Sequence, residues 1–492
     1  MNFVTLDFAV FFLVVLAAGW AVQDRPRAGK AVLLCANLFF YAWAGWVFVP
    51  LLLTVATLNW ATVRLIAMPG GGRIGEDEPR RDGWRRWILA VDVGLHVALL
   101  AFFKYYEFFV LNLEALFRLA GFEAPHLPMA DILFPVGLSF YTFQGLSYAV
   151  DRYRRRRDGG EGAKPESFGR VLLFVSFFPT VMAGPILRES QFFPQLDRPV
   201  RDAAALPEGF ALLLSGLFKK VVLASYLSEH VVRDVFQAPE LYSSWAVLAA
   251  VYGYAMQIFC DFSGYSDLAA GVGRLMGFRI PQNFNSPYLA LNLRDFWRRW
   301  HITLSLWLRD YLYIPLGGSR RGSRTLNLLV TMGLGGLWHG SHVRFLAWGL
   351  LHGLGLAAVH VFEAFTRRPG APAAVGRWFA ARPGKCLAWL LTFHTVALLW
   401  IFFRAEDMDR ALEIFRRLFC FGQPGDGFPA LAIPAILAAF AVQLWGGRLF
   451  VAFAGVQARL PWALQSVTAA LAAGCILKMG PDGVMPFIYF QF

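Results

Sequence analysis

Two histidines in apolar stretches of the chain are the side chains best suited to chemistry. His339 lies in GLGGLWHGSH (333–342), and His301 lies in WRRWHITLS (297–305). A polar group at membrane depth is costly, so it marks a functional site by default. A neutral imidazole can act as a general base near neutral pH without carrying a permanent charge. The sequence therefore predicts proton transfer at His339, whereas His301 is a candidate for facing a substrate.

The expected depth of His339 follows from the helix that precedes it. If that helix begins near Thr325, a rise of about 1.5 Å per residue places His339 roughly 20 Å along it. This is past the midpoint of a bilayer core about 30 Å thick. His342 lies nearby, but no carboxylate stands beside the two histidines, so they give poor support for a metal site. Gly336 and Gly340 form a GxxxG pair, which is typical of close helix packing.

The sequence around His301 reads as one amphipathic helix within Leu291 to Gly322. Its polar stripe, at spacings of four, three, four and four, consists of Arg294, Arg298, His301, Ser305 and Arg309. Only a period of about 3.6 residues brings these positions together. One interpretation is a helix in the cytoplasmic interface with its arginines on lipid phosphates. The other is that the stripe lines a polar tunnel in which His301 faces a substrate.

Further candidates are a loop, two aspartates and several single histidines. Pro315 to Gly322 is rich in Gly and Arg and could cradle a phosphorylated donor through backbone N–H groups, although it matches no Walker or GxGxxG pattern. Asp261 and Asp267 interrupt an apolar segment and could orient a histidine, cap a broken helix or bind Lys or Arg. A hydrogen bond to a neighbouring helix is the expected role of His96, His352, His360 and His394.

The composition indicates that membrane helices hold these residues. The 492 residues are 57% hydrophobic and 16% charged, whereas soluble domains carry about 25% charge. The net charge of +13 comes from short basic bursts between long uncharged runs, which disfavours a nucleic-acid-binding surface. The five cysteines are widely scattered, so neither a zinc site nor a disulfide framework is indicated.

Uncharged runs predict about 11 membrane crossings, within two either way. Ala31 to Val63 reads as two spans joined by a turn at Gly45 and Pro50, and Thr325 to Phe362 is also long enough for two. Residues 241–280 read as two segments, and Gly209 to Val232, which contains Lys219 and Lys220, reads as re-entrant or interfacial. The other expected spans are 3–23, 87–110, 132–150, 171–187, 386–403, 428–447 and 461–477.

The distribution of cations predicts that the N-terminus faces outward and that the basic loops face the cytoplasm. The intervening loop at 113–131 has a single cation, Arg118. The basic loops contain Arg25, Arg27, Lys30, Arg73, Arg80, Arg81, Arg85, Arg86, Arg152, Arg154 to Arg157, Arg367, Arg368, Arg377, Arg382 and Lys385.

Several motifs resemble the membrane-bound O-acyltransferase (MBOAT) superfamily. These are WRRWHITLS (297–305), YLYIPLGGSR (311–320) and LWHG (337–340). Others resemble the bacterial alginate O-acetyltransferase (AlgI-like) branch, namely FFPTVMAGPILR (177–188), DFSGYSDLAAGVGRLMGFRIPQNFNSPY (261–288), IFFRAEDMDRA (401–411) and PFIYFQF (486–492). Together they cover most of the chain from about residue 130 onward, in family order.

The resemblance implies an all-α integral membrane protein with a central funnel. We expect one polytopic domain, with N-terminal helices in 1–130, a catalytic core in 131–365 and C-terminal helices in 366–492. His339 takes the position of the family's catalytic histidine, and His301 that of the second motif histidine. The motif around His301 is matched at Arg298, Trp300, Ser305, Arg309, Asp310 and Tyr311. The other candidate substrate-binding residues are Pro315, Gly317, Gly318, Trp338, Asp261 and Asp267.

The resemblance also implies a cytoplasmic acyl donor and an outward acceptor. We expect acetyl-CoA or another acyl thioester as co-substrate, no bound cofactor, and an exopolysaccharide such as alginate as the acceptor. His339 would take the acceptor's proton, and His301 or the Trp338 N–H would bind the oxyanion. Membrane lipid and periplasmic acetyltransferase or polysaccharide-export proteins are the expected partners at a bacterial inner membrane, and nucleic acid is not.

Three alternatives remain open. The same chemistry could serve cellulose, peptidoglycan, or teichoic acid that receives D-alanine. A transporter would move its substrate without chemistry, but neither inverted repeats nor paired discontinuous helices are evident. A structural scaffold would not need a deep histidine beside a basic stripe.

Overall fold

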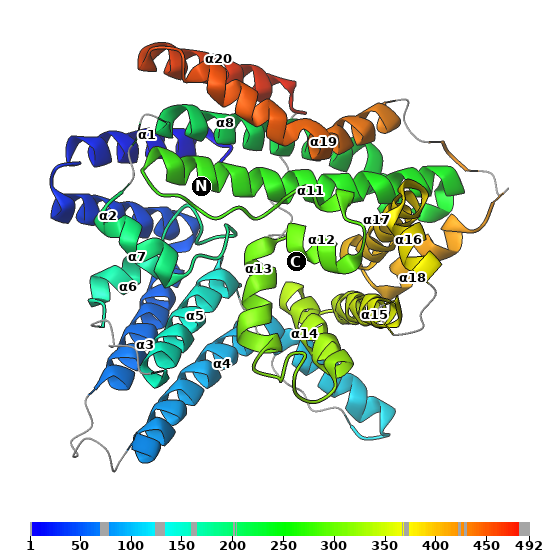
Figure 1. The fold of residues 1–492 in the computed structure, drawn as a ribbon, viewed down its shortest axis with the longest axis horizontal. Coiled ribbons are helices and arrows are strands. Elements are labelled where there is room, and N and C mark those ends of the chain that lie inside the picture. Colours follow the sequence, from blue (N-terminus) through cyan, green and yellow to red (C-terminus); the bar gives the residue numbers. More distant parts are fainter. Residues whose placement is uncertain are drawn as a thin grey trace. The chain divides into compact units, whose positions relative to one another are not determined.

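Apolar, charge-poor runs separated by Gly, Pro and charged loops fold into helices in the computed structural model (Figure 1). The structure describes residues 2–68, 78–123, 133–158, 165–199, 202, 204–366, 368, 373–421, 425–427 and 431–481. These ranges contain no β-strand, which confirms the predicted all-α class. The motif at 486–492 and the basic-loop residues Arg73 and Arg367 lie outside them. The predicted central funnel and three-part division of the domain stay predictions.

The chain forms two compact units, each described here by itself. Unit 1 is Met1–Val200 with Met276–Arg279, and unit 2 is Arg201–Leu275 with Ile280–Phe492. The helices of unit 1 are α1 (Leu6–Ala21), α2 (Pro26–Gly45), α3 (Val49–Ala67), α4 (Glu78–Leu119), α5 (Leu138–Arg157), α6 (Phe168–Val175) and α7 (Glu189–Asp197).

One prediction for unit 1 is confirmed and another is wrong. A short 3₁₀ turn at Trp46–Phe48 joins α2 to α3, as expected from the turn residues there. The run 171–187 is not a spanning helix, because α6 ends at Val175 and turns follow. Pro179 and Pro185 lack the backbone N–H that a continuing helix needs. The segment is nevertheless buried, so its apolar character reflects burial inside the protein.

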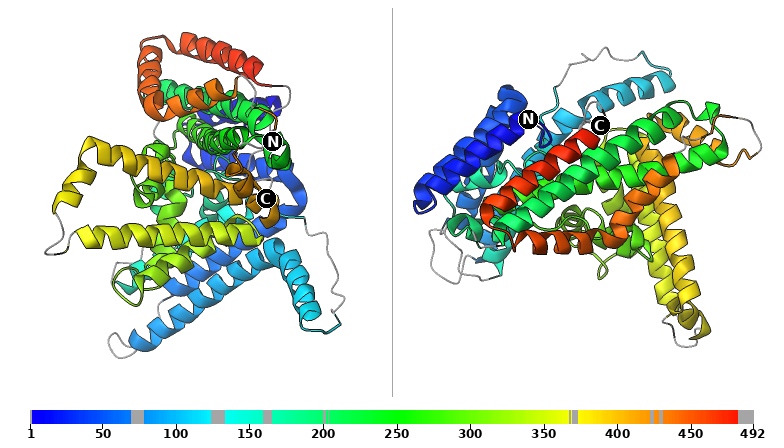
Figure 2. Two further views of the ribbon diagram at one scale, coloured as in Figure 1. Left: turned by 90° about the vertical axis from the view of Figure 1, so that its right-hand side faces the viewer. Right: turned by 90° about the horizontal axis from the view of Figure 1, so that it is seen from above.

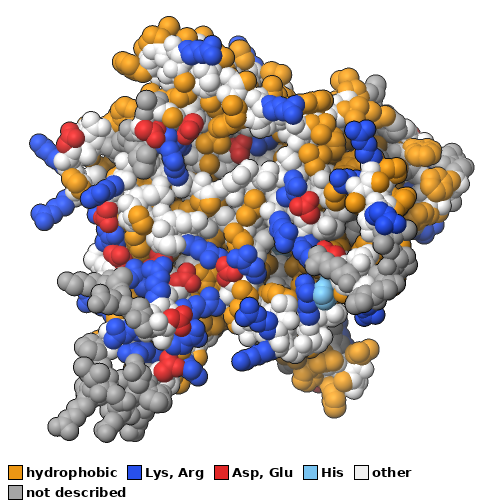
Figure 3. Space-filling view, viewed as in Figure 1, with side chains coloured by type: hydrophobic (Ala, Val, Ile, Leu, Met, Phe, Trp, Pro, Cys, Tyr) orange, Lys and Arg blue, Asp and Glu red, His pale blue; other side chains and the backbone are white. Residues whose placement is uncertain are grey.

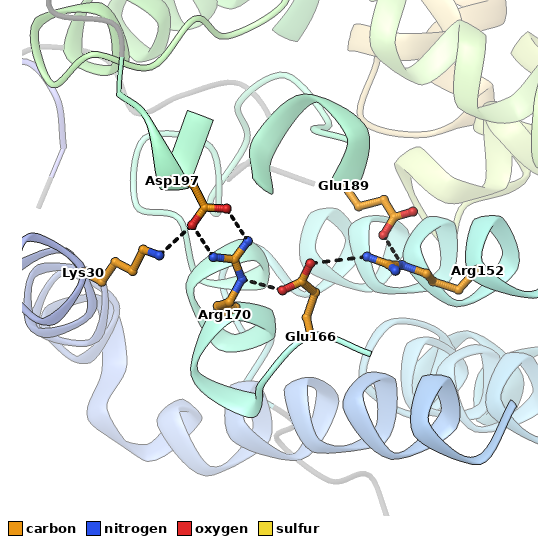
Figure 4. A network of polar contacts seen from close by, with 6 residues as sticks. All are labelled: Lys30, Arg152, Glu166, Arg170, Glu189 and Asp197. Atoms are coloured by element: carbon orange, nitrogen blue, oxygen red, sulfur yellow. Dashed lines mark hydrogen bonds and ion pairs between the residues drawn. The ribbon is translucent and has the colours of Figure 1, made fainter. Parts of the chain in front are cut away.

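Charged side chains of unit 1 form a network that joins α2, α5, α6 and α7 (Figure 4). Its members are Lys30, Arg152, Glu166, Arg170, Glu189 and Asp197. Asp197 accepts from Lys30 at 2.7 Å and from Arg170 at 2.5 and 3.0 Å. Arg170, and then Lys30, lower the pKa of Asp197 to about 2. Figure 3 shows Lys and Arg side chains gathered with acidic ones over α5 to α7.

Unit 2 begins with α8 (Ala205–Leu217), which continues through π-helical turns at Phe218–Ala224 and Ser228–Val232, α9 (Ser225–Leu227) and α10 (Arg233–Gln237). The later helices are α11 (Ser244–Leu275), α12 (Leu293–Arg299), α13 (Ile302–Leu308), α14 (Arg324–His339), α15 (Val343–Thr366), α16 (Ala373–Ala380), α17 (Arg382–Arg404), α18 (Met408–Leu418), α19 (Ala432–Gln457) and α20 (Trp462–Met479). Helix α8 packs against α11, α19 and α20 (Figure 1). Helices α15 and α17 run beside each other, with α16 packed at one end of the pair (Figure 2).

Two ion pairs show how the helices accommodate the charges that we expected to interrupt membrane segments. Lys220 Nζ lies 2.5 Å from Asp261 Oδ1, and Lys219 Nζ lies 2.6 Å from Asp267 Oδ2. Both Ser244–Leu275 and Ala205–Gln237 are therefore continuous helical stretches. The predicted break in 241–280 is wrong, because each aspartate of Ser244–Leu275 is neutralised by a lysine of Ala205–Gln237 across the helix interface.

The described residues contain eight helical stretches that are long and apolar enough to cross a membrane. The chain is thus a multi-pass membrane protein, although the expected count of about 11 crossings is not confirmed. The eight stretches are Pro26–Ala67, Asp82–Leu119, Ala205–Gln237, Ser244–Leu275, Val343–Thr366, Arg382–Arg404, Ala432–Gln457 and Trp462–Met479. Helix α1 is apolar but only 16 residues long.

Candidate active site

His339 is the last residue of α14, where it faces the antiparallel helix α15. The two helices approach closely through glycines. A Cβ atom on Gly336 would lie 2.2 Å from the Phe345 carbonyl oxygen, and one on Gly349 would lie 2.2 Å from the Met332 carbonyl oxygen. The predicted close packing at Gly336 is confirmed, and this packing fixes the end of α14 against α15.

Aromatic rings from three helices surround His339. The ring centroid of His339 lies 4.9 Å from Trp338 of α14, 5.2 Å from Trp348 of α15 and 5.0 Å from Phe403 of α17. Only 6% of His339 is exposed. The imidazole is therefore nearly enclosed in this structure.

His301 lies at a break between two helices. The predicted single helix through this residue is wrong, because α12 ends at Arg299 and α13 begins at Ile302. His301 has φ 42° and ψ 55°, a left-handed conformation rare for a residue with a side chain. Backbone bonds to a distant segment compete with the helix here, since Ile302 N–H donates to the Asn283 carbonyl and Asn285 N–H donates to that of Arg299.

His301 is buried, with 1% of its surface exposed. Phe262 packs edge-on against the ring with centroids 4.6 Å apart, and Trp338 lies at 6.3 Å. Trp338 therefore contacts both motif histidines, which the sequence separates widely. His301 lies outside the apolar spans, and burial lowers its pKa to about 3. The imidazole is thus neutral at physiological pH.

The other residues of the predicted stripe lie in different environments. Arg294 pairs with Glu363 on α15, with nitrogen and oxygen 2.7 Å apart. Arg298 and Arg309 are exposed, and Arg309 Nε donates to Asp310 at 2.6 Å. The Ser305 hydroxyl donates to the Trp300 carbonyl. The stripe is therefore not one tunnel wall, and only His301 among its members is fully buried.

Trp300 and Tyr311, two further predicted binding residues, pack against other aromatic rings. Trp300 is 2% exposed and lies 5.0 Å from Trp400, centroid to centroid. Tyr311 lies 5.3 Å from Trp307. Trp300 thus belongs to the packed core, where it supports the position of the neighbouring His301.

The loop from Pro315 to Gly322 uses several of its N–H groups internally. Gly317 and Gly318 donate to the carbonyls of Ile314 and Tyr313. The N–H groups of Arg320 and Arg321 both donate to the Gly317 carbonyl. These four amides are therefore not available as a phosphate cradle, and the exposed cations of the loop are the side chains of Arg320 and Arg321.

Asp261 and Asp267 bind lysines, which is one of the three roles left open for them. Asp267 also accepts a hydrogen bond from Ser215 at 2.7 Å. No three His, Cys, Asp or Glu side chains converge within the described ranges to form a metal-ligand cluster. The site brings together two buried imidazoles with the Trp338 indole between them.

The single histidines follow their predicted role with one exception. His96 bonds to Asn59, His360 to Arg324 and His394 to Tyr252, each on a neighbouring helix. The prediction is wrong for His352, whose two ring nitrogens have no hydrogen-bond partner among the described residues. Its ring packs against Trp348 and Trp297.

Sequence reasoning missed three residues that shape the site: Trp348, Phe403 and Asn283. Trp348 lies in an apolar run, where nothing in the sequence distinguishes it from an ordinary core residue. Phe403 lies in IFFRAEDMDRA (401–411), which was singled out only by its resemblance. Asn283 lies in a segment, PQNFNSPY (281–288), that was singled out only by its resemblance.

Comparisons with known proteins identify the family of the chain. The model of the MBOAT, membrane-bound O-acyltransferase family matches residues 154–377, which include both histidines. The chain is 33% identical to "Probable alginate O-acetylase AlgI" of Azotobacter vinelandii over 98% of each chain. It is 35% identical to "Peptidoglycan O-acetyltransferase" of Helicobacter pylori over 80% of this chain and 75% of the relative. It is 29% identical to "Teichoic acid D-alanyltransferase" of Bacillus subtilis over 55% of this chain and 69% of the relative. The chain belongs to the membrane-bound O-acyltransferase family and is therefore an acyltransferase.

Proposed function

We propose that this acyltransferase moves an acetyl group from a cytoplasmic acyl thioester, acetyl-CoA, to a hydroxyl of an exopolysaccharide such as alginate. The observation that carries the proposal is the position of His339. It ends a helix inside unit 2 and is enclosed by rings from three helices, with a second buried histidine across Trp338. A neutral imidazole can act there as a general base near neutral pH without carrying a permanent charge.

In the proposed reaction, the acceptor hydroxyl oxygen attacks the thioester carbonyl carbon while His339 removes the hydroxyl proton. The tetrahedral oxyanion then collapses, a C–O ester bond remains, and the C–S bond breaks. The leaving thiolate takes the proton from His339, which returns to its neutral form. No enzyme-bound acyl intermediate is needed, and we assign no Ser or Cys as a nucleophile.

We place the donor on the cytoplasmic side of a bacterial inner membrane, with the N-terminus facing outward. Two observations support this orientation. The loop before α14 exposes Arg320 and Arg321, which suit the phosphates of a coenzyme. The Arg-rich end of α5, at Arg154 to Arg157, belongs to another basic loop. Membrane lipid and periplasmic acetyltransferase or export proteins are the proposed partners, and no bound cofactor is required.

An exopolysaccharide is the preferred acceptor because the similarity to the alginate O-acetylase extends over nearly the whole of both chains. Peptidoglycan is the second candidate, supported by the relative from Helicobacter pylori. D-alanyl transfer to teichoic acid has weaker support, since that relative matches little more than half of this chain.

Deleting the gene and measuring ester-linked acetate in separated cell polymers tests the proposal. We expect acetate to disappear from the exopolysaccharide and to remain on peptidoglycan. A copy of the gene on a plasmid should restore the acetate of the exopolysaccharide. Loss from peptidoglycan alone would transfer the assignment to the second candidate. Unchanged acetate in both polymers would refute the proposal.

A further inference from the structure

We infer that Asn283 is a positioning residue, which holds His301 in the tautomer whose Nε2 presents a lone pair to the substrate. The inference deepens the proposed function, on which it rests, by assigning His301 the role of hydrogen-bond acceptor. It starts from three polar side chains in unit 2: Asn283, His301 and Thr303.

The orientation of the Asn283 amide is fixed by a backbone group. The Thr303 N–H donates to Asn283 Oδ1 at 3.1 Å, and the Thr303 hydroxyl lies 2.9 Å from the same oxygen. A backbone N–H can only donate, so the atom facing it must be the amide oxygen. The amide nitrogen then lies 3.4 Å from the Ser266 hydroxyl, which can accept its hydrogen.

The orientation of this amide determines the proton position on His301. His301 Nδ1 lies 3.3 Å from Asn283 Oδ1. Two lone pairs would repel at this distance, so Nδ1 carries the hydrogen and donates it. A neutral imidazole has only one N–H, and Nε2 is therefore an acceptor.

His301 Nε2 has no hydrogen-bond partner among the described residues, although its side chain is buried. Leaving a buried acceptor unsatisfied is costly. A structure that holds such an atom beside the indole of Trp338 is prepared for a ligand that supplies an O–H or N–H. The acceptor sugar supplies hydroxyls, and the arm of a coenzyme thioester supplies amide N–H groups.

The surrounding chain restrains His301 at its ring and at its backbone. Phe262 packs edge-on against it, and the left-handed backbone of His301 is held by the bond from Ile302 N–H to the Asn283 carbonyl. Strained backbone of this kind persists only where the surroundings over-determine it. Nearest along these elements are Asp261, which precedes Phe262 and pairs with Lys220, and His339, which follows Trp338.

This assignment decides between the two candidates for the oxyanion. A neutral His301 with a hydrogen on Nδ1 cannot donate from Nε2, so it cannot bind the oxyanion there. An indole N–H can only donate. Of these two candidates, Trp338 is then the one able to donate to the oxyanion, and His301 orients a substrate.

Matched variants of the purified full-length protein test the inference by steady-state acetyl transfer. Asn283→Leu should lower kcat about tenfold or more, the cost of at least one lost hydrogen bond. Asn283→Asp should retain activity at high pH. Its acid limb in the pH–rate profile should move to higher pH, because a carboxylate beside the imidazole of His301 favours the protonated imidazole. Ser266→Ala, which removes only the hydroxyl beside the amide nitrogen, should stay within about twofold. A purely structural role for Asn283 would leave the acid limb of the Asn283→Asp profile unchanged, and that result would overturn the inference.

The substrate partner of Nε2 follows from the Michaelis constants of His301→Phe. A raised KM for the polysaccharide assigns a sugar hydroxyl, and a raised KM for the thioester assigns an amide of the donor arm. Unchanged values for both would contradict a substrate contact.

A second measurement does not depend on activity. Protonated and bare imidazole nitrogens have different ¹⁵N chemical shifts in solid-state NMR of histidine-labelled protein, and the His301→Phe spectrum identifies the His301 signals. We expect the hydrogen on Nδ1, and a hydrogen on Nε2 would refute the inference. A wild-type protein that transfers no acyl group would refute the proposed function and leave this test intact.

Discussion

The imidazole of His301 and the indole of Trp338 lie with their ring centroids 6.3 Å apart, although they come from separate elements of unit 2. Because Trp338 also lies beside His339, one indole joins the two motif histidines into a single site. The N–H of this indole is the donor that we assign to the oxyanion.

Trp338→Phe keeps an aromatic ring and removes only the donor. We expect kcat to fall about 10²–10³-fold with a much smaller change in KM, because the lost bond forms chiefly in the transition state. Steady-state transfer from a radiolabelled acetyl thioester measures both constants. A kcat within threefold of wild type would show that another group stabilises the oxyanion.

Gly336→Ala tests the close contact of α14 and α15. The new Cβ would lie 2.2 Å from a backbone carbonyl, so the helices must separate at a cost of about 1–3 kcal/mol. Thermal unfolding in detergent should show a lowered Tm together with reduced activity. Gly335→Ala is the matched control, since its Cβ would meet only the tip of Leu308 at 3.2 Å. Equal Tm values for both variants would contradict the packing described here.

The ion pair of Lys220 and Asp261 predicts an asymmetric mutational response. Lys220→Met removes the lysine that pairs with the buried Asp261 carboxylate, and breaking a buried pair costs about 3–5 kcal/mol. The double variant with Asp261→Leu should recover most of the lost stability. Lys219→Met is the control and should lower the stability less, because 27% of the side chain of its partner Asp267 is exposed to solvent. Denaturant or thermal unfolding of the wild type, the single variants Lys220→Met and Asp261→Leu, the double variant and the control measures the coupling. Additive losses in the double variant would refute it.

Asp197 predicts a pH dependence of stability in unit 1. Its pKa is about 2 in the folded chain, below the value of about 3.9 in an unfolded one. The stabilisation is therefore present above pH 4 and is lost as the pH falls toward 2. It is modest, because half of the side chain is exposed. Asp197→Asn should abolish this part of the pH dependence, whereas the exposed control Asp24→Asn should not.

Local sequence signals found the residues whose type and spacing are unusual for a membrane segment. His339 was recognisable because an imidazole in an apolar, glycine-rich run has few structural explanations. The turn at Gly45 was recognisable because glycine and proline end helices whatever surrounds them.

Long-range contacts explain what the sequence did not reveal. The helix breaks at His301 because residues 283–285 take its backbone bonds, and periodicity carries no information about so distant a partner. The charges of Lys220 and Asp261 each looked like an interruption, since neither sequence window shows the other. Trp348 and Phe403 resemble core residues until the fold places them against His339.

The most direct test of the account is acyl transfer by purified His339→Ala in a single turnover. We predict that the rate falls about 10²–10⁴-fold, although the variant still inserts into the membrane and purifies as a folded protein. The control, His342→Ala at an exposed position, should keep the wild-type rate. A His339→Ala protein that transfers acetyl at the wild-type rate would contradict the assignment of His339 as the general base.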